Sequence, residues 1–163
     1  MPNLSFCSLA CPPPVPGESP FTMMSETLLS DDRAVFREES DQALQEQERY
    51  LTKIERQMFT GGKKIRPVVM LLAARMIAGA SPLNPKVHKG AASLEMLHVA
   101  TLIHDDIVDE AALRRGLPSV SAARGIKTAL LVGDLQFVQA LRGFAHTVEA
   151  DRDMGLVRLV LDT

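Results

Sequence analysis

The sequence predicts an all-α protein, and three observations support this. Apolar residues recur every three or four positions along the body of the chain, a spacing that places them on one face of a helix. No segment shows the alternation of apolar and polar residues that is typical of a half-buried strand, and no internal repeat is present. Glycine and proline residues separate the helical segments. These helices are too apolar to stand alone and are expected to pack around a core.

The composition excludes several classes of protein. The formal net charge is −2, so the overall charge does not point to nucleic acid or an anionic membrane as a partner. The two cysteines, Cys7 and Cys11, leave the body without a disulfide framework or a thiolate metal site, which fits a reducing compartment. No apolar run reaches the ~18 residues that a membrane span needs. A cytoplasmic protein is therefore expected.

Residues 1–24 are predicted to be a disordered leader. CPPPVPGESP (11–20) is too rich in proline for regular structure, and the first 20 residues lack the Lys or Arg of a targeting signal. One alternative stays open, in which Met23 or Met24 is the true start of the protein. The folded body is accordingly assigned to residues 25–163.

Two helices are predicted in the first part of this body. The first covers residues 30–59, with Ser30 as its N-cap and the glycine pair at 61–62 as its end. The second is an apolar helix over residues 67–80, which begins with a proline in its first turn and is followed by the loop SPLNP (81–85). Neither segment contains a strand signal.

Residues 86–113 are predicted to form one long helix that ends before Gly116. A short helix follows at 119–123, and a further helix covers 127–145. Another helical segment is expected to begin at Asp151. The long helix carries most of the charged residues that suggest a function.

Four carboxylates and two guanidinium groups occupy residues 104–116, HDDIVDEAALRRG. At about 100° per residue, Asp105 and Asp109 share one helix face about 40° apart. Two carboxylates one turn apart repel each other, so a cation is expected between them. Mg²⁺ suits this position because it takes oxygen ligands from one or two carboxylates, water and substrate phosphates. Zinc is disfavoured, since no HExxH motif and no nearby cysteine is present.

Arg114 and Arg115 follow these acidic residues, and two interpretations are open. They pair with Asp109 and Glu110 as surface ion pairs, which are worth only ~0–1 kcal/mol each. Alternatively, their guanidinium forks hold phosphate oxygens beside the metal. Carboxylates, metal and arginines together predict a diphosphate site.

A second cationic cluster, GGKKIRP (61–67), places Lys63, Lys64 and Arg66 in a glycine-rich turn before a helix. Cations beside free backbone amides at a helix start suit an anion, although a basic surface turn is the simpler alternative. The segment is not a P-loop, because Gln57 stands where that motif needs glycine and Lys64 where it needs serine or threonine.

These motifs together resemble those of the trans-type polyprenyl diphosphate synthases. GGKKIRP resembles the family's GGKxxRP motif, and LHVATLIHDDIVDEAALRRG resembles its first aspartate-rich motif, DDxxD followed by RRG. GDLQFVQA (133–140) resembles the GDxLxxxA helix. Order and spacing agree across residues 30–145, so the resemblance implies part of an isoprenoid-synthase-type helical bundle.

The resemblance implies head-to-tail prenyl transfer between isopentenyl diphosphate and an allylic diphosphate. Mg²⁺ on Asp105 and Asp109 holds the allylic diphosphate, and Arg114 helps to neutralise the leaving group, so these three are the implied catalytic residues. The implied substrate-binding residues are Lys63, Arg66, His98, Arg114 and Arg115.

Product length is implied by the residues before the aspartates. The growing chain of this family descends along the helix, where enzymes with short products tend to place bulky aromatic residues. Ala100 and Thr101 are small, so we expect a medium or long polyprenyl product.

Supporting roles are expected for four nearby residues. Asp106 matches the second aspartate of the motif but points away from the other two, which predicts an electrostatic role without metal ligation. His104 is expected to cap or pack. Gly133 and Asp134 are expected to serve helix packing and a buried hydrogen bond.

The chain also departs from the family pattern. Family members are about twice as long and carry a second aspartate-rich motif, which is absent here, and Ser121 replaces a customary histidine. We therefore expect the N-terminal portion of a synthase, truncated before the second aspartate-rich helix. The alternatives are a non-catalytic partner subunit of a full-length synthase and a helical domain with mere surface charge networks. The family implies a homodimer or heterodimer.

Overall fold

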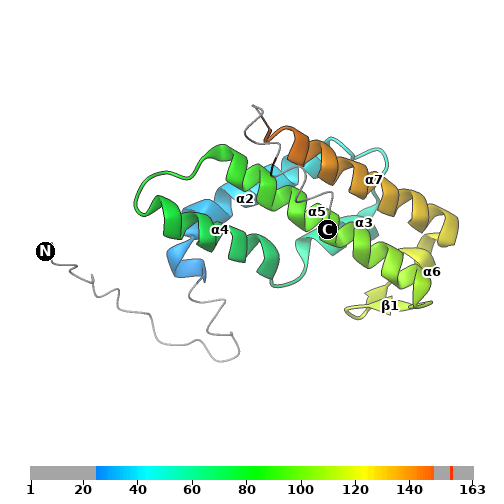
Figure 1. Cartoon of the computed structure of the whole chain (residues 1–163). Coiled ribbons are helices and arrows are strands. Elements are labelled where there is room, and N and C mark those ends of the chain that lie inside the picture. The colour runs from blue at the N-terminus through cyan, green and yellow to red at the C-terminus, as the bar shows by residue number, and fades with distance from the viewer. Residues whose placement is uncertain (1–24, 149–154, 156–163) are drawn as a thin grey trace, which may run out of the picture.

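The computed structural model describes residues 25–148 and Gly155, and helices dominate this part of the chain (Figure 1). The predicted all-α class is confirmed. The leader over 1–24 and the start of the last predicted helix at Asp151 lie outside the described residues. The elements in chain order are α2 (Ser30–Gln45), α3 (Lys53–Thr60), α4 (Ile65–Ala78), α5 (Pro85–Val108), β1 (Leu113–Arg114), β2 (Leu117–Pro118), α6 (Val120–Arg124) and α7 (Ile126–Ala145).

Helix α5 forms the centre of the molecule, with α4 on one side and α7 on the other (Figure 1). It begins where Asn84 accepts a hydrogen bond from the Lys86 backbone N–H and where Pro85 occupies the first turn. Small residues allow close approach of α7, since Gly143 packs against the Ser93 hydroxyl of α5. The position of α5 thereby fixes the acidic residues at its C-terminal end.

Two apolar clusters stabilise this arrangement. One joins α2 and α3 to α5, α6 and α7 and includes the fully buried Ile103, Val120 and Ala129. The other joins α2, α4 and α5 through residues such as Phe36 and Leu71. The second cluster therefore covers α5 around Ala91 and Ala92, and the first covers it from Met96 to Ile103, while Asp105 and Asp109 near its C-terminal end stay exposed.

A buried ionic cluster also ties α2, α4 and α5 together. Asp32 is 6% exposed and lies 2.5 Å from Arg75 Nη2 through its Oδ2. Its Oδ1 lies 3.1 Å from His88 Nε2. A carboxylate that is buried this deeply needs such partners to offset its desolvation. Asp32 is thus a structural residue far from the acidic end of α5.

The first predicted helix is wrong in two respects. It breaks between Gln45 and Lys53, and its N-cap is Leu29, which is 1% exposed, instead of Ser30. The break arises because Gln47 turns inward and accepts a hydrogen bond of 2.7 Å from Gln136 of α7. A new helix then starts with a capping box of Thr52 and Glu55.

The long helix ends at Val108, five residues before its predicted end, and the expectation that the chain has no strand is wrong just beyond it. Leu113 pairs with Pro118, and Arg114 pairs with Leu117, in a short antiparallel hairpin. Its two central residues, Arg115 and Gly116, have φ of 51° and 79°. Positive φ at both positions is typical of the type I′ turn that closes tight hairpins.

The remaining predicted boundaries agree to within two residues. Helix α4 covers 65–78 where 67–80 was expected, and α7 covers 126–145 where 127–145 was expected. In the described part of the chain, no helix is both long enough and apolar enough to cross a membrane.

Candidate functional site

The C-terminal end of α5 exposes two carboxylates on one face. Asp105 lies in the last turn, and Asp109 caps the helix, where its backbone N–H donates to the Asp105 carbonyl at 2.8 Å. Both side chains are exposed. The last carbonyl groups of a helix carry partial negative charge, which further favours a cation at this end. The predicted spacing of one helical turn is therefore present.

These residues fit the ligand preference of Mg²⁺. Between residues 25 and 148, no three His, Cys, Asp or Glu side chains converge into a preformed metal site. Two exposed carboxylates suit a hard cation that keeps several waters and takes its other oxygen ligands from phosphates. They do not suit structural zinc, which needs four nitrogen or sulfur ligands.

Asp106 turns inward and binds Arg114 of the hairpin. Its carboxylate is 1% exposed and accepts hydrogen bonds from Arg114 Nε at 2.8 and 3.0 Å and from Nη2 at 2.5 Å. These hydrogen bonds, with smaller contributions from the charges of Asp106, Asp105 and Asp109, raise the pKa of the Arg114 guanidinium above its usual range. The partner of Arg114 is thus Asp106, where the sequence offered Asp109 or Glu110. The pair fixes the hairpin to the acidic end of α5.

The glycine–lysine turn (61–64) meets this hairpin at Arg115. The Arg115 guanidinium lies directly against the glycine pair, and a Cβ built on Gly62 would be 2.6 Å from its Nη1. Gly62 has a φ of 87°, a conformation in which side chains are strained. The two cationic motifs are distant in the sequence and adjacent in the structure. Lys63 in this turn and Arg66 in the first turn of α4 are both exposed.

Substitution of Gly62 by alanine is expected to disturb this contact. The new Cβ would displace the Arg115 guanidinium, and a positive φ is costly for alanine. We expect the Gly62→Ala variant to bind inorganic pyrophosphate about tenfold more weakly, the loss that often follows removal of a group supporting a ligand-binding residue. Calorimetric titration measures this, with Gly79→Ala as the control, because a Cβ there meets nothing within 4 Å. Equal affinities of the two variants would contradict the expectation.

His98 lies on α5 facing the same cations. Burial lowers the pKa of His98 below its ordinary value, and the charges of Arg66, Arg115 and Lys64 lower it further, while Glu95 opposes them. A neutral imidazole is expected near pH 7. The predicted substrate-binding residues Arg66, His98 and Arg115 are therefore brought together by the fold.

The lowered pKa of His98 gives a pH dependence with a definite sign. The folded protein takes up this proton at a lower pH than the unfolded chain, so this contribution to stability is lost as the pH falls below the ordinary value for histidine. A bound diphosphate stabilises the imidazolium, so its binding is expected to raise the pKa of His98. NMR titration of the His98 ring, with and without inorganic pyrophosphate, is expected to show a low pKa that pyrophosphate raises. A pKa above the ordinary value in the free protein would contradict this.

The two residues proposed to set product length lie on different faces of α5. Ala100 is fully buried in the core, and Thr101 is exposed, where its hydroxyl donates to the His98 carbonyl at 2.8 Å. Adjacent residues of a helix are rotated by about 100°, which explains the difference. Their role in product length stays a prediction.

The contact between α5 and α7 beside the site is close. A Cβ on Gly133 would lie 2.4 Å from His104 Nε2, so the predicted packing roles of Gly133 and His104 are confirmed. The predicted buried hydrogen bond of Asp134 is wrong. Its side chain is 60% exposed and lies 3.4 Å from His104 Nε2, because the residue after the packed glycine rotates toward solvent.

Two buried glutamates near the site were not predicted from the sequence. Glu55 is fully buried and bonds to Thr52 and Arg124; these hydrogen bonds lower its pKa even though burial, the largest single influence, raises it. The Thr-x-x-Glu spacing was its signal in the sequence. Glu95 lies one turn before His98 and binds Lys64, a contact without a local signal.

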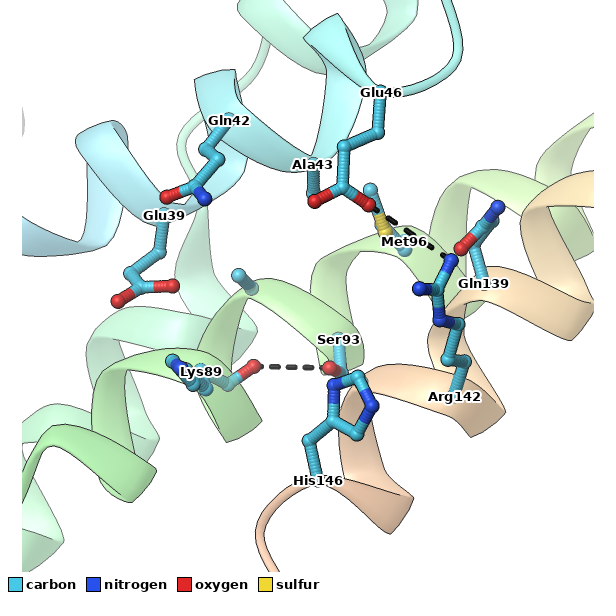
Figure 2. Close-up of a pocket in the computed structure, with 12 residues that line it drawn as sticks. Glu39, Gln42, Ala43, Glu46, Lys89, Ser93, Met96, Gln139, Arg142 and His146 are labelled. Carbon is cyan, nitrogen blue, oxygen red and sulfur yellow. Dashed lines mark hydrogen bonds and ion pairs between the residues drawn. The ribbon is translucent and has the colours of Figure 1, made fainter.

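A separate groove lies between α2, α5 and α7 (Figure 2). Within it, the Ser93 hydroxyl donates to the Lys89 carbonyl at 2.9 Å, and Glu46 lies 3.9 Å from Arg142. None of the predicted catalytic or substrate-binding residues lines it. The candidate site is therefore the region where the end of α5, the hairpin and the glycine–lysine turn meet.

Comparisons with known proteins identify the family of this chain. The polyprenyl synthetase family model matches residues 48–163. Heptaprenyl diphosphate synthase component 2 of Geobacillus stearothermophilus is 40% identical over 121 residues, which are 74% of this chain and 37% of that protein. All-trans-nonaprenyl-diphosphate synthase (geranyl-diphosphate specific) of Rhodobacter capsulatus is 50% identical over 80 residues, 49% of this chain and 24% of that protein.

Solved structures of polyprenyl synthases are also similar to this chain. A polyprenyl synthase from Caulobacter crescentus CB15, complexed with calcium and isoprenyl diphosphate, aligns with a TM-score of 0.62 and 30% identity over 88% of this chain and 42% of that chain. This chain thus spans about two-fifths or less of the length of these relatives. Because the family model covers most of the sequence, the chain belongs to the polyprenyl synthetase family.

Proposed function

We propose that the protein transfers a prenyl group from an allylic diphosphate to isopentenyl diphosphate. The observation that supports this proposal most directly is the contact of Arg115 with the glycine pair. Arg115 lies in the hairpin that Arg114 joins to Asp106 of α5. One region then offers carboxylates for a cation and cations for diphosphate. Relatives named heptaprenyl and nonaprenyl diphosphate synthases support a medium or long product.

In this proposal Asp105 and Asp109 hold Mg²⁺, which supplies Lewis-acid stabilisation of the negative charge on the leaving diphosphate. Arg114 adds positive charge at the same place, and its hydrogen bonds to the buried Asp106 keep its guanidinium in a fixed position. A guanidinium that is held before the reaction needs no reorganisation as charge develops.

The second substrate is bound by the side chains around the glycine–lysine turn (61–64). Isopentenyl diphosphate is held through its diphosphate, which leaves its double bond directed at the allylic carbon. The allylic C–O bond breaks, the new C–C bond forms, and a proton is lost to a phosphate group. The proposed ligands of this diphosphate are Lys63, Arg66, His98 and Arg115.

A second candidate is a non-catalytic subunit that partners a full-length synthase. The name of the Geobacillus stearothermophilus relative, component 2, supports assembly with another chain, and homodimers are the other arrangement we propose. The presence of Lys63, Asp105, Asp109, Arg114 and Arg115 favours the catalytic proposal. A cytoplasmic location is part of both proposals.

Incorporation of radiolabelled isopentenyl diphosphate into prenyl products tests the function. We expect product when Mg²⁺ and an allylic diphosphate are present and none in EDTA. Mixing with a full-length synthase distinguishes the two candidates: product from this protein alone supports the catalytic role. Product that needs the other chain, and that is unaffected by the loss of Asp105, supports the partner role.

A further inference from the structure

We infer that Glu95 is a positioning residue of the diphosphate site, acting through Lys64 to hold the glycine–lysine turn (61–64) against α5. This inference rests on the proposed function, since it concerns how that site is held in shape. Neither residue was predicted to bind substrate. The pair connects the turn that carries Lys63 to the helix that carries His98.

Lys64 and Glu95 form a largely buried ion pair. Lys64 Nζ lies 2.8 Å from Glu95 Oε1, with side chains only 16% and 11% exposed. The same ammonium group donates to the carbonyl of Phe59, on the other side of the glycine pair. Two of its three protons are thus engaged by protein acceptors. Lys64 therefore has a structural role inside the protein, whereas Lys63 and Arg66 are exposed to solvent.

Lys64 also sets the direction of α4. It is the N-cap of that helix and has φ of 50° and ψ of 40°, a left-handed conformation that is strained for a residue with a side chain. Such strain persists only where surrounding contacts impose it. The ion pair with Glu95 is one such contact, because it fixes the side chain of the strained residue itself.

Side-chain packing behind the turn is incomplete. A pocket of about 330 Å³ that opens to solvent lies between α2, the turn and α5, lined by residues that include Phe36, Thr60, Gly62, Lys64 and Glu95. Glycines 61 and 62 add backbone freedom of their own. The Lys64–Glu95 pair forms part of the wall of this pocket, so its loss is expected to release the turn and with it the contact to Arg115.

A positioning role of Glu95 and a purely electrostatic effect of its charge predict opposite changes in anion affinity when Glu95 is replaced. Removal of the Glu95 charge makes the site more positive, so electrostatics alone would strengthen the binding of an anion. Loss of the ion pair would weaken it, because Lys63 and Arg66 would no longer be held beside Arg115. The sign of the change in affinity therefore distinguishes the two.

Titration calorimetry with inorganic pyrophosphate, in EDTA to isolate the cationic residues, measures that sign. We expect Glu95→Gln and Lys64→Met each to weaken binding about tenfold, the scale of loss seen when a group orienting a ligand-binding side chain is removed. Lys64→Arg keeps the charge and the reach to Glu95 and is expected to retain most of the affinity. If Glu95→Gln fails to fold, the double variant K64M/E95Q leaves no unpaired buried charge and carries the same expectation.

Asp32→Asn is the matched control. It also removes a buried carboxylate that binds a cation of α4, and it does so at the far end of that helix. We expect it to lower the melting temperature and leave the affinity for pyrophosphate unchanged. Unchanged or tighter binding by Glu95→Gln would overturn the inference. A parent protein that binds neither pyrophosphate nor isopentenyl diphosphate would instead contradict the proposed function.

Discussion

The Asp105→Asn variant is expected to lose prenyl transfer by about 10²–10³-fold or more, the scale on which one preorganised electrostatic group acts in a transition state. The exchange keeps the shape of the side chain and removes one of the two charges that would hold Mg²⁺. Asp105 is exposed, so the protein should fold normally. Radiolabel incorporation at saturating substrate measures the loss, and added Mg²⁺ is expected to restore part of the activity.

Glu110→Gln is the control for this variant. Glu110 is also exposed and adjoins Asp109, so its replacement removes the same charge at almost the same place. It is not one of the two carboxylates separated by one helical turn. We expect nearly normal activity and an unchanged Mg²⁺ requirement. If both variants lose activity equally, general charge at the helix end matters more than the pair of aspartates.

The largest effect on stability is expected for Arg114→Ala. The substitution leaves the Asp106 carboxylate, which is 1% exposed, without the guanidinium that gives it three hydrogen bonds. An unpaired buried charge of this kind costs about 3–5 kcal/mol, and we expect the lower end because Arg114 itself is 29% exposed. Urea unfolding monitored by circular dichroism measures the change in the free energy of unfolding.

Arg115→Ala provides the comparison within the same hairpin. Arg115 is exposed, and its replacement is expected to change the free energy of unfolding by only about 0.5 kcal/mol. It should instead weaken the binding of inorganic pyrophosphate, because Arg115 faces the cationic turn. Similar losses of stability in the two variants would contradict the prediction that the ion pair with Asp106 makes Arg114 more important for stability than Arg115.

Features with local causes could be predicted from the sequence. The helical spacing of apolar residues predicted α5 and α7, and the glycine pair at 61–62 correctly predicted the end of a helix. The break after Gln45 depends on the contact of Gln47 with Gln136, two residues separated by 89 positions, which no local pattern reveals. The spacing of apolar residues therefore predicted one continuous helix, whereas a tertiary contact breaks it in the structure.

In the candidate site, too, features with local causes could be predicted and features that depend on tertiary contacts could not. The spacing of Asp105 and Asp109 follows from helix geometry, so it could be derived before the fold was seen. That Asp106 points away from these two residues also follows from helix geometry, but its ion pair with Arg114 depends on a hairpin in which two residues have positive φ. The ion pair of Lys64 and Glu95 joins residues 31 positions apart and has no motif of its own.

The central claim is that one divalent cation binds between Asp105 and Asp109 while a diphosphate is held by the neighbouring cationic turn. Crystals of the protein grown with Mn²⁺, which accepts the same oxygen ligands as Mg²⁺, and isopentenyl diphosphate test it through the anomalous signal of the metal. We expect a manganese peak within bonding distance of both aspartates and diphosphate density between Arg66 and Arg115. A peak remote from the aspartates, or a diphosphate bound away from the turn, would contradict the account.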